Sequence, residues 1–188
     1  MYIQQLNQQI KQYIVSFWKK VRDLFNVYNE KQLLSFFKWL DQFVKYLIKE
    51  NSFDPKRIPR LKKGDIIWVA FGHNVGSELG GPRPAIVLEF ENHKKDKNII
   101  VAPVRSYNSN GPKKLFPGLV YVGDNEFLSN NSYVDLKHIR AISKMRIIPQ
   151  YNKSKNKPQR TIGRLTNEQL DKIDEELMKI FLNPKLDK

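Results

Sequence analysis

The sequence predicts an α+β protein in which an N-terminal helical hairpin precedes a small antiparallel β-barrel or sandwich with a closing C-terminal helix. Two patterns support this prediction. Over the first 50 residues, apolar side chains recur at steps of three and four, as amphipathic helices require. From residue 64 onward, short β-branched and aromatic runs alternate with clusters of Asn, Gly, Lys and Ser, which is typical of several short antiparallel strands.

Residues 1–50 are predicted to form two amphipathic helices. The first covers residues 3–28, and Asn29 can cap the second, which continues to about residue 48. A hairpin of about 50 residues cannot bury two broad apolar stripes on itself. We therefore expect it to pack on the second domain or on another copy of the chain, which predicts a homodimer. Its lysines are interpreted as a solvated outer face rather than a nucleic-acid or membrane face.

The remaining chain is predicted to consist of a linker and one barrel domain. Residues 51–63 have the basic, proline-containing composition of a linker, and the domain covers residues 64–184. Strands are predicted at residues 66–71, 83–90, 99–104, 119–122, 133–136 and 145–148. The polar segment 150–160 has no periodicity and is predicted to be a flexible insertion. Thr166 is expected to cap a last helix that covers one side of the sheet.

Composition restricts the chemistry and the partners. Lysine and arginine number 33 against 19 for aspartate and glutamate, which gives a net charge of +14. This charge favours polyanions, with nucleic acid as the first expectation and an anionic membrane surface as the second. The chain has no cysteine and three histidines, so we expect no metal and no cofactor. No apolar run approaches the ~20 residues of a membrane span, and a cytoplasmic location without membrane attachment is expected.

The most informative segment is 64–84, where a strand, a glycine-rich loop and an arginine follow one another. Arg83 starts a new strand directly after a loop that contains Gly72, Gly76, Gly80 and Gly81. An arginine at the mouth of such a loop suits a phosphate site, because its guanidinium binds phosphate with two parallel hydrogen bonds. The competing interpretation is that the glycines serve a wide turn and that Arg83 is a solvated cation.

A basic barrel with an arginine at a loop mouth suggests a ribonuclease. RNA carries its own nucleophile, the 2′-hydroxyl, so cleavage needs a base, an acid and a cation for the phosphate. Arg83 suits the last role, and Arg105 and Ser106 are expected at the same mouth if their strand is a neighbour. Several residues are candidates for the base, and the sequence does not rank them: Asp135, His73, His138 and Glu78. Each also has an ordinary structural interpretation in a turn, an exposed strand or an ion pair.

Four motifs in order resemble the PemK/MazF family of toxin ribonucleases. They are Gly64-Asp65-Ile66, the loop sequence VGSELGGPRP at 75–84, the strand end PVRS at 103–106, and IRAISK at 139–144. The resemblance covers about residues 61–182 and excludes the hairpin. It implies a small SH3-like barrel, usually dimeric, that cuts single-stranded RNA without a metal and leaves a 2′,3′-cyclic phosphate and a 5′-hydroxyl. It also implies an acidic antitoxin whose flexible tail fills the RNA groove.

The resemblance assigns roles to particular residues. Arg83 matches the catalytic arginine, whereas Arg105 and Ser106 stand where many members have threonine and serine. Asp135 is the further catalytic candidate, because some relatives have an aspartate close to this position. The expected RNA-binding residues lie mostly in the loop, and they are His73, Asn74, Ser77, Glu78 and His138.

The sequence thus predicts a type II toxin that acts as a sequence-specific endoribonuclease. The alternative is a non-catalytic binding module on the same barrel, in which Arg105 and His138 mark lost activity. A toxin that acts on a gyrase-type protein target rests on fold analogy alone. For the hairpin, oligomerisation or packing is favoured over an antitoxin platform or a built-in inhibitor.

Overall fold

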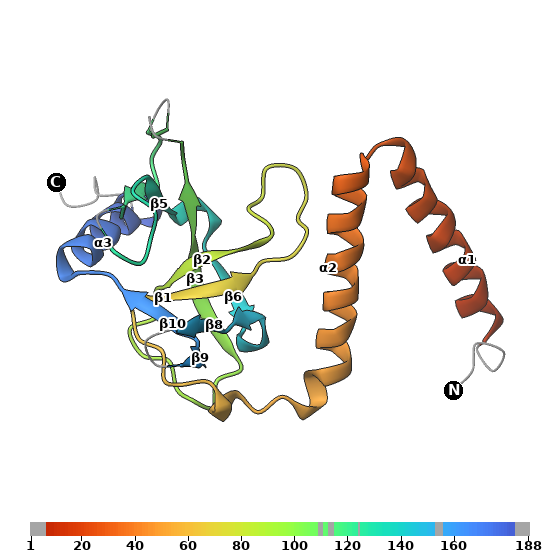
Figure 1. The fold of residues 1–188 in the computed structure, drawn as a ribbon, viewed down its shortest axis with the longest axis horizontal. Helices are drawn as coiled ribbons and strands as arrows, with labels where there is room; N and C mark the ends of the chain where they lie inside the picture. The colour runs from red at the N-terminus through yellow and green to blue at the C-terminus, as the bar shows by residue number, and fades with distance from the viewer. Residues whose placement is uncertain (1–6, 109–110, 113–114, 124, 153–155, 183–188) are drawn as a thin grey trace. The chain divides into compact units, whose positions relative to one another are not determined.

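The computed structural model describes residues 7–108, 111–112, 115–123, 125–152 and 156–182. The chain divides into two units, Met1–Glu50 and Asn51–Lys188, which are described separately below (Figure 1). The predicted helix start at residue 3 and the predicted domain end at residue 184 lie outside the described residues, as does part of the 150–160 segment.

The N-terminal unit contains the predicted pair of helices. Helix α1 covers Gln8–Asp23, a 3-10 turn, η2, covers Leu24–Asn26, and helix α2 covers Glu30–Lys49. The side chain of Asn29 accepts a hydrogen bond from the backbone N–H of Gln32 at 3.0 Å, and the Gln32 side chain accepts one from the Asn29 N–H at 2.9 Å. This reciprocal capping box fixes the start of α2 and confirms the cap predicted from the sequence.

The apolar stripes of this unit are largely uncovered. Among the described residues of α1 only Val21 is buried, and α2 has no buried residue. Ile48 is 76% exposed and Trp18 is 51% exposed. One ring contact between the two halves of the unit lies beside the connecting turn, where the centroids of Phe25 and Phe37 are 6.2 Å apart. None of the helices that the structure describes is long and apolar enough to cross a membrane.

The C-terminal unit is built on a curled antiparallel sheet that forms a half-barrel (Figure 1). The strands run in the order β10-β1-β2-β3-β5-β4, while β6 pairs with β3 and β7 pairs with β1. Their bounds are β1 Asp65–Ala70, β2 Pro82–Val87, β3 Asn98–Ser106, β4 Leu119–Tyr121, β5 Ser132–Asp135, β6 Arg140–Ser143, β7 Ile147–Ile148 and β10 Thr161–Arg164. The antiparallel sheet, its closing helix and the preceding helix pair confirm the predicted fold class.

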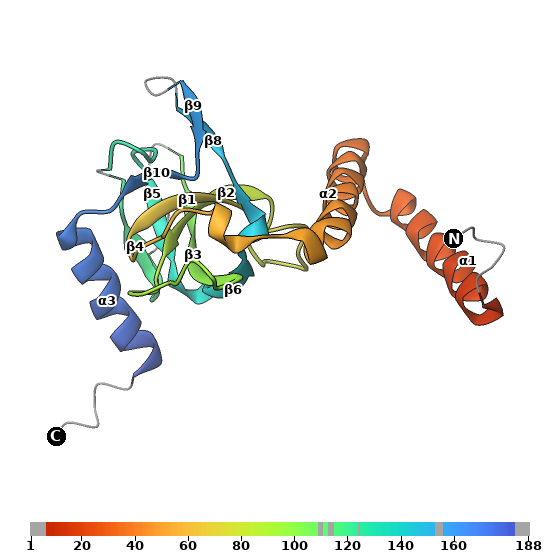
Figure 2. The same ribbon diagram turned by 90° about the horizontal axis from the view of Figure 1, so that it is seen from below.

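Both faces of the sheet are buried in its centre. Ile67 and Val69 of β1 belong to one apolar cluster, and Ile66 belongs to a second cluster on the other face. Helix α3, Asn167–Phe181, covers this second face and inserts the fully buried Ile173 (Figure 2). Thr166 caps α3 in a second capping box, as the sequence predicts.

The strand boundaries differ from prediction at several places. The predicted strand 145–148 begins in a 3-10 turn, η6 (Lys144–Arg146), and only Ile147–Ile148 forms a strand, β7. β2 ends at Val87 rather than continuing to Phe90, which is 83% exposed. The Glu89 side chain accepts a hydrogen bond from the backbone N–H of Ile100 at 2.7 Å, so a side chain replaces the strand ladder there. β6 was not predicted, because its four residues bury only Ile142 and show no clear alternation.

Two segments for which the sequence predicts no regular structure, 51–63 and the described part of 150–160, are ordered parts of the C-terminal unit. Residues 51–63, whose composition predicts a linker, contribute Ile58 and Leu61 to the first core cluster, where they are 2% and 1% exposed. Within 150–160, strand β8, Gln150–Asn152, pairs with β9, Lys157–Gln159. These strands are short and mostly polar, so they lack the hydrophobic alternation by which a strand is recognised.

Candidate functional site

The glycine-rich loop is closed at its neck by backbone contacts. The N–H of Gly81 donates to the carbonyl of Gly72 at 2.7 Å, and the N–H of Phe71 donates to the carbonyl of Gly81 at 3.1 Å. A Cβ at Gly80 would lie 2.7 Å from the Gly72 carbonyl oxygen, so glycine is required at this crossing. Gly81 has a φ of 73°, which also favours glycine. The glycines therefore serve a specific close approach of the two strand ends.

The predicted RNA-binding residues of the loop have different positions. The Asn74 side-chain amide donates to the Leu79 carbonyl at 2.7 Å and so braces the loop from within. Ser77 and Glu78 are exposed near the tip, and His73 is partly buried near the neck. Asn74 thus has a structural role in addition to any contact with a ligand.

Arg83 lies at the mouth of this loop, as the sequence predicts. It is opposite Val69 in the β1–β2 ladder, and its Nε and Nη2 donate to the Gly80 carbonyl at 2.8 and 2.5 Å. Burial lowers the pKa of the Arg83 guanidinium, and the nearby charges of Arg105 and Arg140 lower it further. Asp135 acts in the opposite direction. Arg83 is therefore a partly desolvated cation among other cations.

Asp135 lies at the centre of the second part of the site. Its side chain is fully buried, and its Oδ2 accepts a hydrogen bond from Arg105 Nε at 2.5 Å. Oδ1 accepts the backbone N–H of Lys137 at 3.1 Å. His138 Nδ1 is 3.0 Å from Oδ2, but this buried nitrogen is not aligned for a hydrogen bond with any residue that the structure describes. The carboxylate thus holds Arg105 and lies beside the imidazole of His138.

Strand pairing explains why these residues meet. Ala85 of β2 is opposite Pro103 of β3, and Val104 of β3 is opposite Val134 of β5. Because side chains alternate along a strand, Arg83 and Arg105 point to the same face of the sheet. The expectation that the two strands are neighbours is therefore confirmed.

Ser106 is not brought to this site. It follows Arg105 directly and shares its face with Val104, which packs in the cluster beneath α3. Its hydroxyl is 3.3 Å from that of Ser132 and accepts a hydrogen bond from Ser129 at 3.0 Å. The period of two along a strand thus separates Ser106 from Arg83, which differs from the sequence-based expectation that both Arg105 and Ser106 face the mouth.

Two arginines of the site were not among the sequence-based candidates. The guanidinium of Arg140 lies 5.3 Å from the centroid of the Phe71 ring and is close enough to affect Arg83. Arg146 Nη1 donates to the carbonyls of Ala70 and Phe71 at 3.2 and 3.3 Å. Arg140 lies within the 139–144 motif, and this motif is the sequence feature that could have identified it as a site residue. Arg146 has no such motif.

The site is therefore rich in cations and poor in metal ligands. Within the described ranges, no three His, Cys, Asp or Glu side chains come together as a metal site would require. Arg105 is bound to the buried carboxylate of Asp135, and Arg83 is close enough to Arg105, Arg140 and Asp135 to be affected by their charges. Guanidinium groups in this number suit a phosphate group, which each can bind with two hydrogen bonds.

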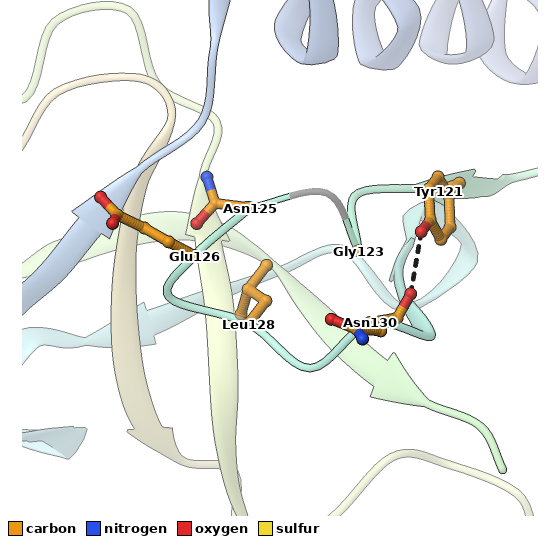
Figure 3. Close-up of a pocket in the computed structure, with 6 residues that line it drawn as sticks. All are labelled: Tyr121, Gly123, Asn125, Glu126, Leu128 and Asn130. Carbon is orange, nitrogen blue, oxygen red and sulfur yellow. Dashed lines mark hydrogen bonds between the residues drawn. The ribbon is translucent and has the colours of Figure 1, made fainter. Parts of the chain in front are cut away.

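A separate pocket lies at the connection between β4 and β5 (Figure 3). Its volume is about 480 Å³, and none of the predicted site residues lines it; the lining residues are Tyr121, Gly123, Asn125, Glu126, Leu128 and Asn130. Tyr121 donates its hydroxyl to the Asn130 carbonyl at 2.9 Å, as Figure 3 shows. The Asn125 amide donates to the Arg164 carbonyl at 2.9 Å.

The fold and the site together define a small basic half-barrel with an arginine cluster beside a glycine-rich loop. The family model described as PemK-like, MazF-like toxin of type II toxin-antitoxin system matches residues 62–181, so the chain belongs to this toxin family. The family resemblance noted in the sequence is thereby confirmed.

Solved structures of MazF and related endoribonucleases are similar to this chain. MazF (Form-I) from Deinococcus radiodurans has 18% sequence identity and a TM-score of 0.43, with 64% of this chain and 94% of that chain covered. A mycobacterial endoribonuclease in complex with its cognate antitoxin has 14% identity and a TM-score of 0.43, with 65% and 93% covered. Comparison with curated proteins gives no match.

Proposed function

We propose that this toxin is an endoribonuclease that cuts single-stranded RNA at specific sequences without a metal or cofactor. The 2′-oxygen attacks the adjacent phosphorus, the bond from phosphorus to the 5′-oxygen breaks, and a 2′,3′-cyclic phosphate and a 5′-hydroxyl result. The proton of the 2′-hydroxyl passes to a base, and the leaving oxygen takes a proton from an acid. The observation that supports this reaction is the cluster of Arg83, Arg105 and Arg140 at the mouth of the glycine loop.

The roles of the catalytic candidates follow from their burial. Arg83 is at the loop mouth, where it would stabilise the charge of the pentacoordinate phosphate. Asp135 is fully buried, so we assign it to positioning Arg105 and His138 rather than to contact with RNA. His138 is 19% exposed in its side chain and is our candidate for the base, with Nδ1 beside Asp135 and Nε2 left for the substrate. His73 and Glu78 of the loop are the alternatives.

The experiment is incubation of the purified protein with a long RNA in the presence of a chelator. Discrete fragments that end in a 2′,3′-cyclic phosphate are expected, with 5′-hydroxyl ends downstream, and mapping those ends gives the recognised sequence. Fragments that form only after Mg²⁺ is restored would contradict the metal-free reaction. Binding without cleavage would favour the alternative, a non-catalytic binding module. That alternative is supported by Arg105, which stands where many family members have threonine.

We also propose an acidic protein partner. The chain has a net charge of +14, and its arginine cluster lies on one face of the sheet. A flexible acidic antitoxin segment would compete with RNA for these cations, and opposite charge would speed its association. The mycobacterial endoribonuclease named above was solved in complex with its cognate antitoxin.

Dimerisation is proposed to use the exposed apolar stripes of the helix pair. Replacing both Trp18 and Ile48 with glutamine is expected to shift the protein toward the monomer in sedimentation experiments, because the two side chains are 51% and 76% exposed and would be buried between copies. Helix content by circular dichroism should not change. The control is Lys38→Gln, which alters an exposed polar position of α2. An equal dimer fraction in both variants would contradict this role.

A further inference from the structure

Three tyrosines form a row that begins beside Arg105. Tyr133 of β5 is opposite Arg105 in the β3–β5 ladder, and Tyr121 of β4 is opposite Tyr133 in the next ladder. Tyr107 follows Arg105 by two residues. The ring centroids of Tyr107 and Tyr133 are 5.5 Å apart, and those of Tyr121 and Tyr133 are 5.2 Å apart, both in edge-to-face contact. We call Tyr107, Tyr121 and Tyr133 the tyrosine row.

The row lies on the face of the sheet that also holds the arginine cluster. Val104, Val120 and Val134 point into the cluster beneath α3. Their neighbours in sequence, Arg105, Tyr121 and Tyr133, therefore point to the opposite face. Two strand spacings separate β3 from β4, so the row extends about 10 Å from Arg105 across the sheet. A nucleotide whose phosphate lies at Arg105 would place its neighbour over these rings.

The three tyrosine side chains remain partly accessible to solvent. Tyr121 is 39% exposed, and Tyr107 and Tyr133 are partly exposed. The hydroxyl of Tyr121 is bound to the Asn130 carbonyl, which fixes the ring in one orientation (Figure 3). A fixed, accessible aromatic ring loses little conformational freedom when a ligand stacks on it.

We propose that the tyrosine row is a base-stacking platform for the RNA nucleotides next to the scissile phosphate. Single-stranded nucleic acid is held by cations along its backbone and by aromatic side chains on which bases stack. Here Arg83, Arg105 and Arg140 supply the cations, and the row supplies the stacking surface. The inference rests on the proposed function for its substrate, but it concerns binding and can be tested without cleavage.

The test compares two probes that cannot be cut because they lack the 2′-hydroxyl. One is a fluorescein-labelled single-stranded DNA of random sequence, and the other is an abasic DNA with the same number of phosphates. The full-length protein is expected to bind the first probe about tenfold more tightly, because only that probe has bases that can stack on the row. Tyr107→Leu and Tyr121→Leu should each lose about fivefold or more toward the base-containing probe and nothing toward the abasic one.

Conservative variants separate stacking from packing. Tyr107→Phe and Tyr121→Phe keep the ring and should keep the preference for bases, whereas the leucine variants keep apolar volume and should lose it. Tyr151→Leu is the matched control, because Tyr151 is a 62% exposed tyrosine of β8 outside the row. An equal loss toward both probes, or leucine variants that bind like the wild type, would overturn the platform. Absence of RNA cleavage would overturn the proposed function and leave these binding results unaffected.

Discussion

Arg83→Ala is expected to reduce RNA cleavage by at least about 100- to 1000-fold, the loss typical of removing one preorganised group that stabilises charge in the transition state. Growth arrest on expression should disappear with it. The guanidinium of Arg83 donates two hydrogen bonds to one loop carbonyl, that of Gly80. The free energy of unfolding should therefore fall by no more than about 3 kcal/mol, the upper value for a hydrogen bond to a charged group. Single-turnover cleavage of a mapped RNA and chemical denaturation measure the two effects.

Two further variants show whether charge or shape matters at this position. Arg83→Lys keeps the positive charge and loses the planar fork that binds two phosphate oxygens, so an activity between those of the wild type and the alanine variant is expected. Arg60→Ala removes one positive charge from an exposed position in the 51–63 segment and is the matched control for net charge. If Arg83→Ala and Arg60→Ala cut RNA at the same rate, Arg83 is not catalytic.

The arginine cluster is electrostatically incomplete in the free protein. Arg83 and Arg105 share one face of the sheet, and their mutual repulsion with Arg140 contributes to the lowered pKa of Arg83. Asp135 offsets part of this charge but is already bound to Arg105. An added phosphate would pair with these partly exposed guanidinium groups and relieve the repulsion. The same reasoning applies to a carboxylate of an acidic antitoxin, so RNA and antitoxin are expected to exclude each other at this position.

The local sequence is enough to predict the position of a residue whose type has one strong structural preference. Asn29 and Thr166 have a glutamine three residues later, and both form capping boxes. Arg83 could be placed because glycines precede it and an apolar strand follows. Strand geometry alone predicts that Ser106 does not share the face of Arg105, because adjacent residues of a strand point to opposite faces. The expectation that Ser106 lies beside Arg83 rested only on its position next to Arg105 in the sequence.

Other features depend on tertiary contacts that no local pattern shows. Ile58 and Leu61 lie in a basic, proline-containing segment, and only the barrel core explains their burial. The approach of Arg140 to the site depends on the pairing of β6 with β3, where Val101 is opposite Arg140. The short strand β6 could not be recognised without its partner, because strands of four residues with one buried side chain carry too little periodicity.

Asp135→Asn is expected to destabilise the protein and to impair cleavage together. The carboxylate is fully buried and accepts a hydrogen bond from Arg105, so an amide at this position leaves a guanidinium without its counter-charge. Breaking a buried ion pair costs about 3–5 kcal/mol, and the lower end is expected because Arg105 is 29% exposed. Cleavage should fall more than about tenfold, since neither Arg105 nor His138 would keep its position. Urea denaturation and single-turnover cleavage measure the two losses.

A double-variant cycle separates the two effects. Arg105→Met removes the guanidinium and keeps much of the aliphatic length of the side chain, so the combination with Asp135→Asn should recover part of the lost stability, with a coupling energy of about 1–3 kcal/mol. Cleavage should not recover, because both the cation and the group that positions His138 are then absent. If stability and cleavage recover together, Arg105 and Asp135 form a structural ion pair, and the phosphate chemistry must rest on Arg83 and Arg140. If Asp135→Asn is as stable as the wild type, the ion pair does not hold this part of the site.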